Sequence, residues 1–241
     1  MWNSKDFEAV YSPKSIKDIV YPNEYSKTLI EQLVKGARPF PIPAGKCGIL
    51  LHGIPGTGKS ALAKLLPDAI EWNRNRGDAQ SDTLFCAVQQ GNNGLKLLEK
   101  IDSNAHHFPQ SASHHYYILD EVDNLNVQAM KMLKSVMNYP GCVFILTTNN
   151  FASVEAGVVS RCHCIAFNAA PASSWLPLAR RMLSDARMTG ISDEQLLAVI
   201  ETGKGSARDI LDALVSVVLN VTSHSGNMQS ASERRLVKEM L

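Results

Sequence analysis

The chain has 241 residues, a formal net charge of +1 and 20% charged residues. This length predicts one sizeable domain and a smaller one. The near-neutral charge does not call for nucleic acid, although it leaves room for local basic patches. We find no signal peptide, and no apolar run approaches the roughly 18 residues that a membrane span needs, so we expect neither secretion nor membrane insertion.

The first part of the chain leads to a phosphate-binding motif. A helical pattern covers Glu24 to Val34, and a linker rich in proline follows. The apolar run Cys47 to Leu51 predicts a buried strand, and the stretch Gly53 to Ser60 fits the pattern G-x-x-x-x-G-K-[ST] at every position. A helix-forming run comes next, and we expect Pro67 to end or kink that helix early.

The strand, the loop and the helix are the context in which this motif binds nucleotide phosphates. Its glycines let the backbone N–H groups point into one concavity, and the helix adds its positive N-terminal end. Lys59 can reach the β- and γ-phosphates, and the Ser60 hydroxyl can ligate Mg²⁺. We therefore predict that ATP contacts Gly53, Pro55, Gly56, Thr57, Gly58, Lys59, Ser60 and Ala61.

A second motif lies at the end of a later apolar strand, His115 to Leu119, where two carboxylates follow. Asp120 would hold Mg²⁺, and Glu121 would polarise the water that attacks the γ-phosphate. Because parallel sheets bind ligands at the carboxyl ends of their strands, we expect this pair to lie beside the phosphate-binding loop. Helix capping is the alternative explanation of such an acidic pair.

Strand and helix signals alternate through this region, which predicts an α/β domain with a parallel sheet. After Pro171 no strand signals remain, and Ser192 with Gln195 forms the pattern of a capped helix start. We predict an α/β domain over 1–170, a three-helix domain over 171–222 and a flexible tail over 223–241. The expected elements are strands over 83–88, 142–148 and 164–167, helices starting at 95 and covering 128–137, 173–188, 192–202 and 206–221, a loop over 102–113, and a short helix over 232–241.

At this point the chain resembles the clamp-loader subfamily of the AAA+ ATPases, which includes replication factor C small subunits and bacterial gamma/tau. The stretch Tyr11 to Val20 is similar to its N-terminal motif, with Ser12 in place of the usual arginine. The stretch Phe144 to Asn149 is similar to the sensor 1 strand, and Ser160-Arg161-Cys162 to the S-R-C motif. Gly205 to Asp209 resembles the start of the sensor 2 helix.

The resemblance implies a P-loop NTPase fold with a helical lid domain, and it implies several roles. Asn149 would contact the attacking water, Arg161 would reach the nucleotide of a neighbouring subunit, and Arg208 would contact the phosphates of its own subunit. The N-terminal motif would line the adenine pocket through Tyr11, Ile19 and Val20. For Asn149, Arg161 and Arg208, an ordinary turn, salt-bridge or solvated residue is the alternative.

DNA contact is a further expectation from the resemblance. Lys96, Lys131 and Lys134 are candidates for phosphate contacts, and a solvated helix face is the alternative for each. The stretch Val88 to Asn92 replaces a family segment that follows the second strand, which weakens this assignment. Cys162-His163-Cys164 lacks a second ligand pair, so zinc is not expected there.

The leading hypothesis is an ATPase subunit, with ATP and Mg²⁺ as cofactors, that assembles with other AAA+ subunits and grips and releases a sliding clamp or DNA in replication. The alternative is an AAA+ adaptor or remodeller that acts on a protein partner, such as a helicase loader or a mobile-element or defence ATPase. A third hypothesis is a nucleotide-gated assembly protein with negligible turnover. The sequence ends soon after the expected lid, without the family's third, collar-forming domain, so we expect either a truncated chain or a minimal relative that assembles differently. We expect a cytoplasmic protein, or a nuclear one in a eukaryote.

Overall fold

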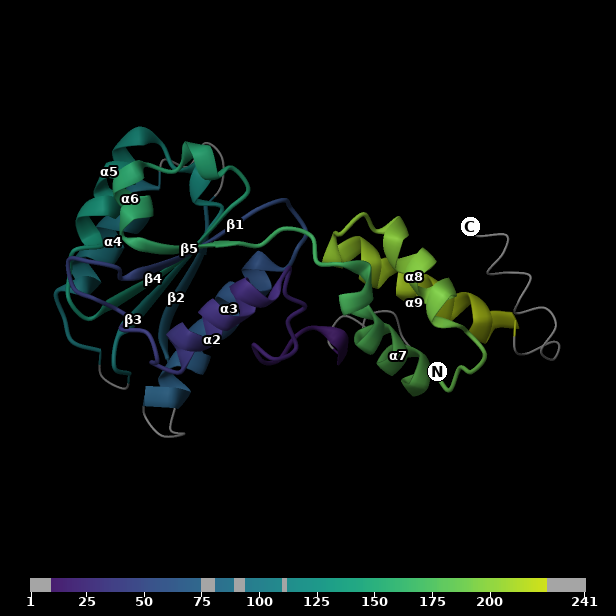
Figure 1. Ribbon diagram of the computed structural model, residues 1–241. Helices are drawn as coiled ribbons and strands as arrows, with labels where there is room; N and C mark the ends of the chain where they lie inside the picture. The colour runs from purple at the N-terminus through teal and green to yellow at the C-terminus, as the bar shows by residue number, and fades with distance from the viewer. Residues whose placement is uncertain (1–9, 75–80, 89–93, 110–111, 225–241) are drawn as a thin grey trace.

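A computed structural model describes residues 10–74, 81–88, 94–109 and 112–224, which form an α/β domain and a helical domain (Figure 1). The α/β domain contains a five-stranded sheet in the order β2-β3-β4-β1-β5, and every neighbouring pair is parallel. The predicted fold class is therefore confirmed. The strands are β1 (Gly48–His52), β2 (Asp82–Ala87), β3 (His115–Asp120), β4 (Cys142–Thr148) and β5 (Cys162–Ala166).

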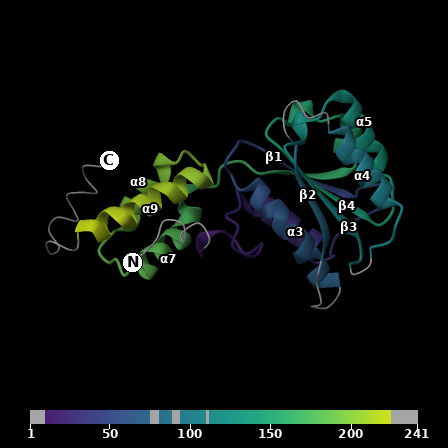
Figure 2. The same ribbon diagram turned by 180° about the vertical axis from the view of Figure 1, so that it is seen from behind.

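Helices cover both faces of the sheet, as the two opposite views show (Figure 1, Figure 2). Because side chains alternate between the faces of a strand, Ile49 and Leu51 pack on one side and Leu50 on the other. This double coverage explains why the central strands are continuous apolar runs in the sequence. One face carries α2 (Glu24–Val34) and α3 (Lys59–Arg74), and the other carries α4 (Leu95–Ala105), α5 (Val127–Val136) and α6 (Ala156–Ser160).

The helical domain has a hydrophobic core of its own, and among its described residues there is no strand. Trp175, Leu196 and Ile210 are buried in this core. Tyr11, far away in the sequence, is buried in the same cluster, so the start of the described chain packs against the C-terminal helices. The helices are α7 (Leu176–Asp185), α8 (Asp193–Thr202) and α9 (Ala207–His224), and 3₁₀ turns occur at η1 (Val122–Asn124), η2 (Phe151–Ser153) and η3 (Ala172–Trp175).

The expectation that Pro67 ends its helix early is wrong. Pro67 is buried in the middle of α3, which continues to Arg74. Leu62, Leu66 and Ile70 are fully buried at helical spacing around it. The apolar contacts along this side of α3 outweigh the lost backbone hydrogen bond that a proline causes.

Other boundaries also differ from those expected from the sequence. Helix α4 extends to Ala105 and takes up the first residues of the expected loop, because Ile101 and Ala105 continue its buried side. The helix expected over 173–188 begins with the 3₁₀ turn η3 and ends at Asp185. The turn η2 and the helix α6 were not anticipated, and the expected helix over 232–241 lies outside the described residues.

All five cysteines are free. Burial raises the pKa of Cys47 to about 11 and that of Cys142 to about 12, so these thiols stay protonated at neutral pH. Within the described ranges, no group of three or more His, Cys, Asp or Glu side chains could hold a metal ion. None of the described helices is long and apolar enough to cross a membrane.

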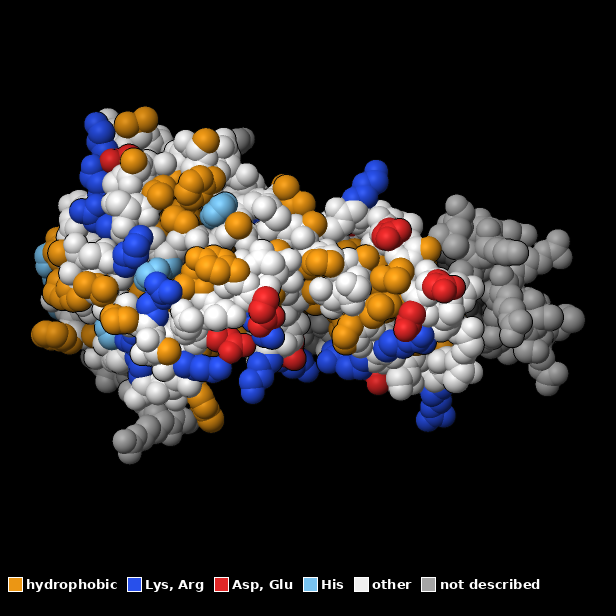
Figure 3. Space-filling model, in the orientation of Figure 1, with side chains coloured by type: hydrophobic (Ala, Val, Ile, Leu, Met, Phe, Trp, Pro, Cys, Tyr) orange, Lys and Arg blue, Asp and Glu red, His pale blue; other side chains and the backbone are white. Residues whose placement is uncertain are grey.

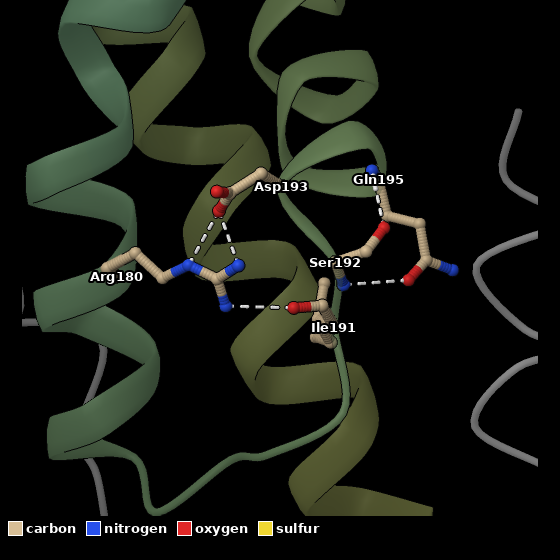
Figure 4. Close-up of polar contacts among 5 residues, drawn as sticks. All are labelled: Arg180, Ile191, Ser192, Asp193 and Gln195. Atoms are coloured by element: carbon tan, nitrogen blue, oxygen red, sulfur yellow. Dashed lines mark hydrogen bonds and ion pairs between the residues drawn. The ribbon is translucent and has the colours of Figure 1, made fainter.

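The start of α8 has the capping box that the sequence predicts (Figure 4). The amide of Gln195 donates to Ser192 Oγ at 3.3 Å, and the Gln195 side chain accepts from the amide of Ser192 at 3.0 Å. Beside it, the guanidinium of Arg180 contacts Asp193 and the carbonyl of Ile191. Because these charged groups are exposed to water, we assign more stability to the cap than to the ion pair.

Replacing Ser192 by Ala should lower the free energy of unfolding by about 1 kcal/mol, because one amide in the first turn of α8 loses its acceptor. Ser192→Asn, which keeps a side-chain acceptor, should retain most of the stability. Urea denaturation followed by circular dichroism measures both variants. Equal losses in the two variants would show that the cap contributes nothing of its own.

Candidate active site

The phosphate-binding loop connects β1 to α3, and its glycines adopt backbone angles that other residues avoid. Gly53, Gly56 and Gly58 have φ values of 147°, 78° and 98°. A Cβ atom on Gly53 would lie 2.7 Å from both the carbonyl oxygen of Phe167 and Asn168 Oδ1. A side chain at position 53 is therefore excluded by backbone conformation and by contact with the chain beyond β5.

Two side chains of the loop bind its own backbone and its surroundings. Thr57 is buried, and its hydroxyl donates to the carbonyl of Phe167 at 2.7 Å. The Lys59 ammonium donates to the carbonyls of Gly53 at 2.9 Å and Ile54 at 2.6 Å. Burial lowers the pKa of Lys59, and nearby carboxylates, Asp120 first among them, oppose this shift.

The carboxylate of Asp120 joins the two sequence motifs. Its Oδ1 atom accepts hydrogen bonds from the hydroxyls of Ser60 at 2.7 Å and Thr147 at 2.6 Å. The prediction that the acidic pair lies beside the loop is therefore correct for Asp120. Thr147 comes from β4, so one carboxylate oxygen connects the start of α3, the end of β3 and the end of β4.

Glu121 has a left-handed backbone conformation, with φ 60° and ψ 54°. Such a conformation is costly for a residue with a side chain, and its surroundings must hold it. The amide of Glu121 donates to Thr147 Oγ1 at 3.0 Å, and its carboxylate accepts from Asn124 Nδ2 at 3.3 Å. The exposed carboxylate thus lies next to Asp120 at the same edge of the sheet.

Asn149 is exposed immediately after β4, one residue beyond the buried Thr148. Since β4 lies between β1 and β3, this places Asn149 at the same edge as the phosphate-binding loop and the acidic pair. Thr148 donates to Asp123 Oδ1 at 2.9 Å, which connects the end of β4 to the turn after Glu121. The contact of Asn149 with an attacking water stays a prediction.

The first turn of α9 contacts the phosphate-binding loop directly. The amide of Ala207 donates to the carbonyl of Gly56 at 2.8 Å. A Cβ atom on Gly56 would lie 2.5 Å from Ser206 Oγ, so the two segments touch. Arg208, the next residue of α9, is exposed and follows a residue bonded to the loop. Its contact with phosphate stays a prediction.

Arg161 lies at the opposite end of the sheet from the loop of its own chain. It comes just before β5, and its carbonyl accepts from the amide of Gly48 at the start of β1. The loop follows the other end of β1, about 16 Å away for five residues at 3.3 Å each. Figure 1 shows the same separation, with α6 at the far end of the sheet from α9.

The residues expected around adenine occupy the junction of the two domains. Tyr11 donates to Asp185 Oδ2 at 3.0 Å, and burial with this carboxylate raises the pKa of Tyr11 to about 12. Val20 packs with the helical-domain core and Ile19 with the α/β core. These three residues line a groove of about 1220 Å³ between the N-terminal segment, α2 and α7, which the phosphate-binding loop does not line. Their contact with adenine stays a prediction.

The three candidate lysines for DNA differ in their surroundings. Lys96 on α4 and Lys131 on α5 are exposed, whereas Lys134 forms an ion pair with Glu155 at 2.8 Å. Figure 3 shows basic side chains gathered over the side of the α/β domain that carries α5 and α6. Nothing in these contacts selects DNA, so the assignment stays a prediction.

Sequence reasoning did not assign a role to Thr147 or to the chain beyond β5. The available signal for Thr147 was that a polar residue stands at the end of an apolar strand. Thr147 is buried, with 1% of its surface exposed. Phe167 acts through its carbonyl oxygen, and a backbone carbonyl leaves no trace in residue type. The donor set itself fits Mg²⁺, because the Ser60 hydroxyl and the Asp120 carboxylate converge and both offer hard oxygen ligands.

Comparisons with known proteins agree with this geometry. Relatives are replication factor C subunit 4 of Caenorhabditis elegans, 28% identical over 91% of this chain and 65% of its own length, and replication factor C small subunit 2 of Pyrobaculum islandicum, 27% identical over 85% and 61%. DNA polymerase III subunit gamma/tau of Mycoplasma pneumoniae is 23% identical over 85% of this chain and 31% of its own length. The chain spans less than two thirds of the length of these relatives.

Solved structures support the fold alone. A mutant form of RuvB from Thermotoga maritima matches with a TM-score of 0.70 and 16% identity, over 95% of this chain and 73% of that one.

The model of the family described as DNA polymerase III, delta subunit, matches residues 45–171. Since this match includes more than half of the chain and the relatives are clamp-loader subunits, the protein belongs to the DNA polymerase III delta-subunit family, among the clamp-loader AAA+ proteins.

Proposed function

We propose that the protein is an ATPase subunit of a clamp-loader-like assembly, in which ATP binding and hydrolysis control the grip on a sliding clamp and DNA. One observation carries this proposal. The phosphate-binding loop and the acidic pair lie at one edge of the sheet, and Arg161 lies at the other. A single chain therefore offers half of a site at each end, and neighbouring chains would complete it.

Binding of ATP would use the loop between β1 and α3. The backbone N–H groups of the loop and the N-terminal end of α3 attract phosphate oxygens. The Lys59 ammonium, which binds the carbonyls of Gly53 and Ile54, would exchange these acceptors for phosphate oxygens. Ser60 and Asp120 would hold Mg²⁺, which when bound neutralises charge on the β- and γ-phosphates.

Hydrolysis would be the attack of a water molecule on the γ-phosphorus, with cleavage of its bond to the β–γ bridging oxygen. The carboxylate of Glu121 would orient this water and favour the departure of its proton, and the amide of Asn149 would offer a further hydrogen bond. Thr147 holds the backbone of Glu121 and the carboxylate of Asp120 at the same time. The geometry of the acidic pair is thus preorganised by one buried hydroxyl.

The γ-phosphate would also connect this site to the helical domain and to a neighbouring subunit. Arg208 would contact it from α9, whose first turn already bonds to Gly56. Arg161 of a neighbouring subunit would contact it from outside, since its permanent planar charge suits phosphate. Loss of the γ-phosphate would release both contacts, which is a switch driven by one charged group.

The partners proposed here follow from the relatives' names and from the assembly that the site requires. Replication factor C subunits and DNA polymerase III gamma/tau are replication proteins by name. We infer that this chain assembles with other AAA+ subunits and acts on a sliding clamp and primer–template DNA. We propose no membrane partner. An adaptor that acts on another protein would instead respond to that protein alone.

The proposal predicts that primer–template DNA together with a sliding clamp stimulates ATP turnover by the assembled protein. Glu121→Gln should still bind ATP but hydrolyse it about 100-fold or more slowly, because the water loses its carboxylate acceptor. Phosphate release and binding of a fluorescent ATP analogue measure the two effects separately. Wild-type turnover in Glu121→Gln would remove Glu121 from its role, and no response to DNA and clamp would contradict the loader function.

Arg161→Ala should bind ATP normally yet lose about 1,000-fold in turnover, because its charge acts on the nucleotide of a neighbour. Lys59→Ala should lose turnover because the nucleotide site of its own subunit no longer has the lysine that contacts the phosphates. A mixture of the two variants should regain part of the activity, since the Arg161 of a Lys59→Ala subunit can complete the intact site beside it. Normal hydrolysis by assembled Arg161→Ala, or a mixture as inactive as its components, would contradict action in trans.

Thr147→Val should lower turnover about 10- to 100-fold and raise the Mg²⁺ concentration needed for half-maximal activity. The valine has the same shape but leaves Asp120 Oδ1 with one donor fewer and the amide of Glu121 without its acceptor. Thr147→Ser, which keeps the hydroxyl, is the matched control and should stay near the wild type. A loss of turnover in Thr147→Ser as large as that in Thr147→Val would contradict the role of the hydroxyl, because serine keeps this group.

A further inference from the structure

The turn that precedes β1 binds three successive carbonyl groups around Arg161. The Lys46 ammonium donates to the carbonyls of Ser160 at 3.2 Å and Cys162 at 2.5 Å. The carbonyl of Arg161 itself accepts from the amides of Cys47 and Gly48, both at 3.0 Å. The backbone is therefore held on Arg161 and on both of its neighbours by residues 46–48.

The chemistry of a helix end explains why a lysine suits this position. Helix α6 has only five residues and ends at Ser160, so its last carbonyls lack partners within the helix. An ammonium group has three donors and a positive charge, both of which favour contact with such carbonyls. Lys46 is half-buried, and its backbone carbonyl accepts from the amide of Ile42, which fixes the base of its side chain.

The guanidinium of Arg161 is also held by hydrogen bonds within the subunit, and one of its acceptors lies next to a residue bound by the turn before β1. Its Nε donates to Asn138 Oδ1 at 2.9 Å, and Nη1 donates to the carbonyl of Gly157 at 2.8 Å. Asn138 directly follows Met137, whose carbonyl accepts from Cys47 Sγ at 3.0 Å. The turn before β1 thus supports the backbone of Arg161 and also the segment that carries the acceptor of its side chain.

We propose that Lys46 is a positioning residue that fixes the direction in which the Arg161 side chain projects from the subunit. This proposal rests on the proposed role of Arg161 in trans. Lys46 and Arg161 are both cations, so Lys46 acts through the carbonyls of Ser160 and Cys162 and not through attraction. A guanidinium held in place before the neighbour arrives loses less freedom when it meets a phosphate. If the segment Ser160 to Cys162 were released, Arg161 would keep its charge, but the guanidinium would no longer be held in position.

The first test replaces Lys46 by Met, which keeps the apolar stem and removes the ammonium. Turnover in the assembled state should fall about 10- to 100-fold, as expected for a displaced catalytic group, while ATP affinity stays at the wild-type value. Lys100→Met is the matched control, because Lys100 is an exposed lysine on α4 to which no role is assigned. Its turnover should not change.

A double variant separates positioning from direct action. Lys46→Met combined with Arg161→Ala should hydrolyse ATP no more slowly than Arg161→Ala alone, because Lys46 works only through Arg161. A further loss in the double variant would mean that Lys46 contacts the neighbour's nucleotide by itself. Weaker ATP binding in Lys46→Met would mean that it acts within its own subunit. Either result overturns the proposal.

A second readout does not depend on hydrolysis. The Nε–Hε signal of Arg161 in a ¹⁵N NMR spectrum, assigned by its loss in Arg161→Ala, should be protected from exchange in the wild type and in Lys100→Met. It should exchange faster in Lys46→Met. An unchanged signal there overturns the proposal, whatever the turnover. If Arg161→Ala hydrolyses normally, the role of Arg161 fails, and the NMR signal still decides whether Lys46 orders it.

Discussion

The arrangement of the candidate site depends on the hydrogen bonds that converge on Asp120. Its Oδ1 atom accepts from Ser60 at the start of α3 and from Thr147 at the end of β4. Three segments that are far apart in the sequence therefore meet at one charged oxygen. Charge-assisted hydrogen bonds are stronger than neutral ones, so this junction can also hold the left-handed backbone of Glu121 through Thr147. The loop and the acidic pair act as one unit for this reason.

A second constraint is the direction of β1. The phosphate-binding loop follows its carboxyl end, and the segment around Arg161 is bound to its amino end by Lys46, Cys47 and Gly48. A parallel sheet puts these groups on opposite sides of the domain, and a single side chain cannot bridge the length of a strand. The same strand thus has the phosphate-binding loop at one end and the cation Arg161 at the other. Under the proposed function, this polarity would let subunits assemble in one direction.

Much of the fold followed from local patterns. Helix α2 and strand β4 have the bounds that periodicity and apolar runs predict, and the capping box at Ser192 is present. The errors came where packing overrides local preference. Pro67 stays inside α3 because the residues around it are buried, and α4 continues to Ala105 for the same reason. Short elements such as α6 carry too few residues for a periodic signal.

The sequence by itself determined which residue types make up the candidate site, because the loop from Gly53 to Ser60 and the pair Asp120-Glu121 are short motifs that predict phosphate and Mg²⁺ binding. Only the tertiary structure decided which groups support them. Thr147 was one of several polar residues near a strand end, and Lys46 lies 114 positions before Ser160, whose carbonyl it binds. Such contacts depend on how distant segments are brought together, and many of them use backbone carbonyls. Backbone carbonyls are the same in every residue, so their roles appear only after the chain has folded.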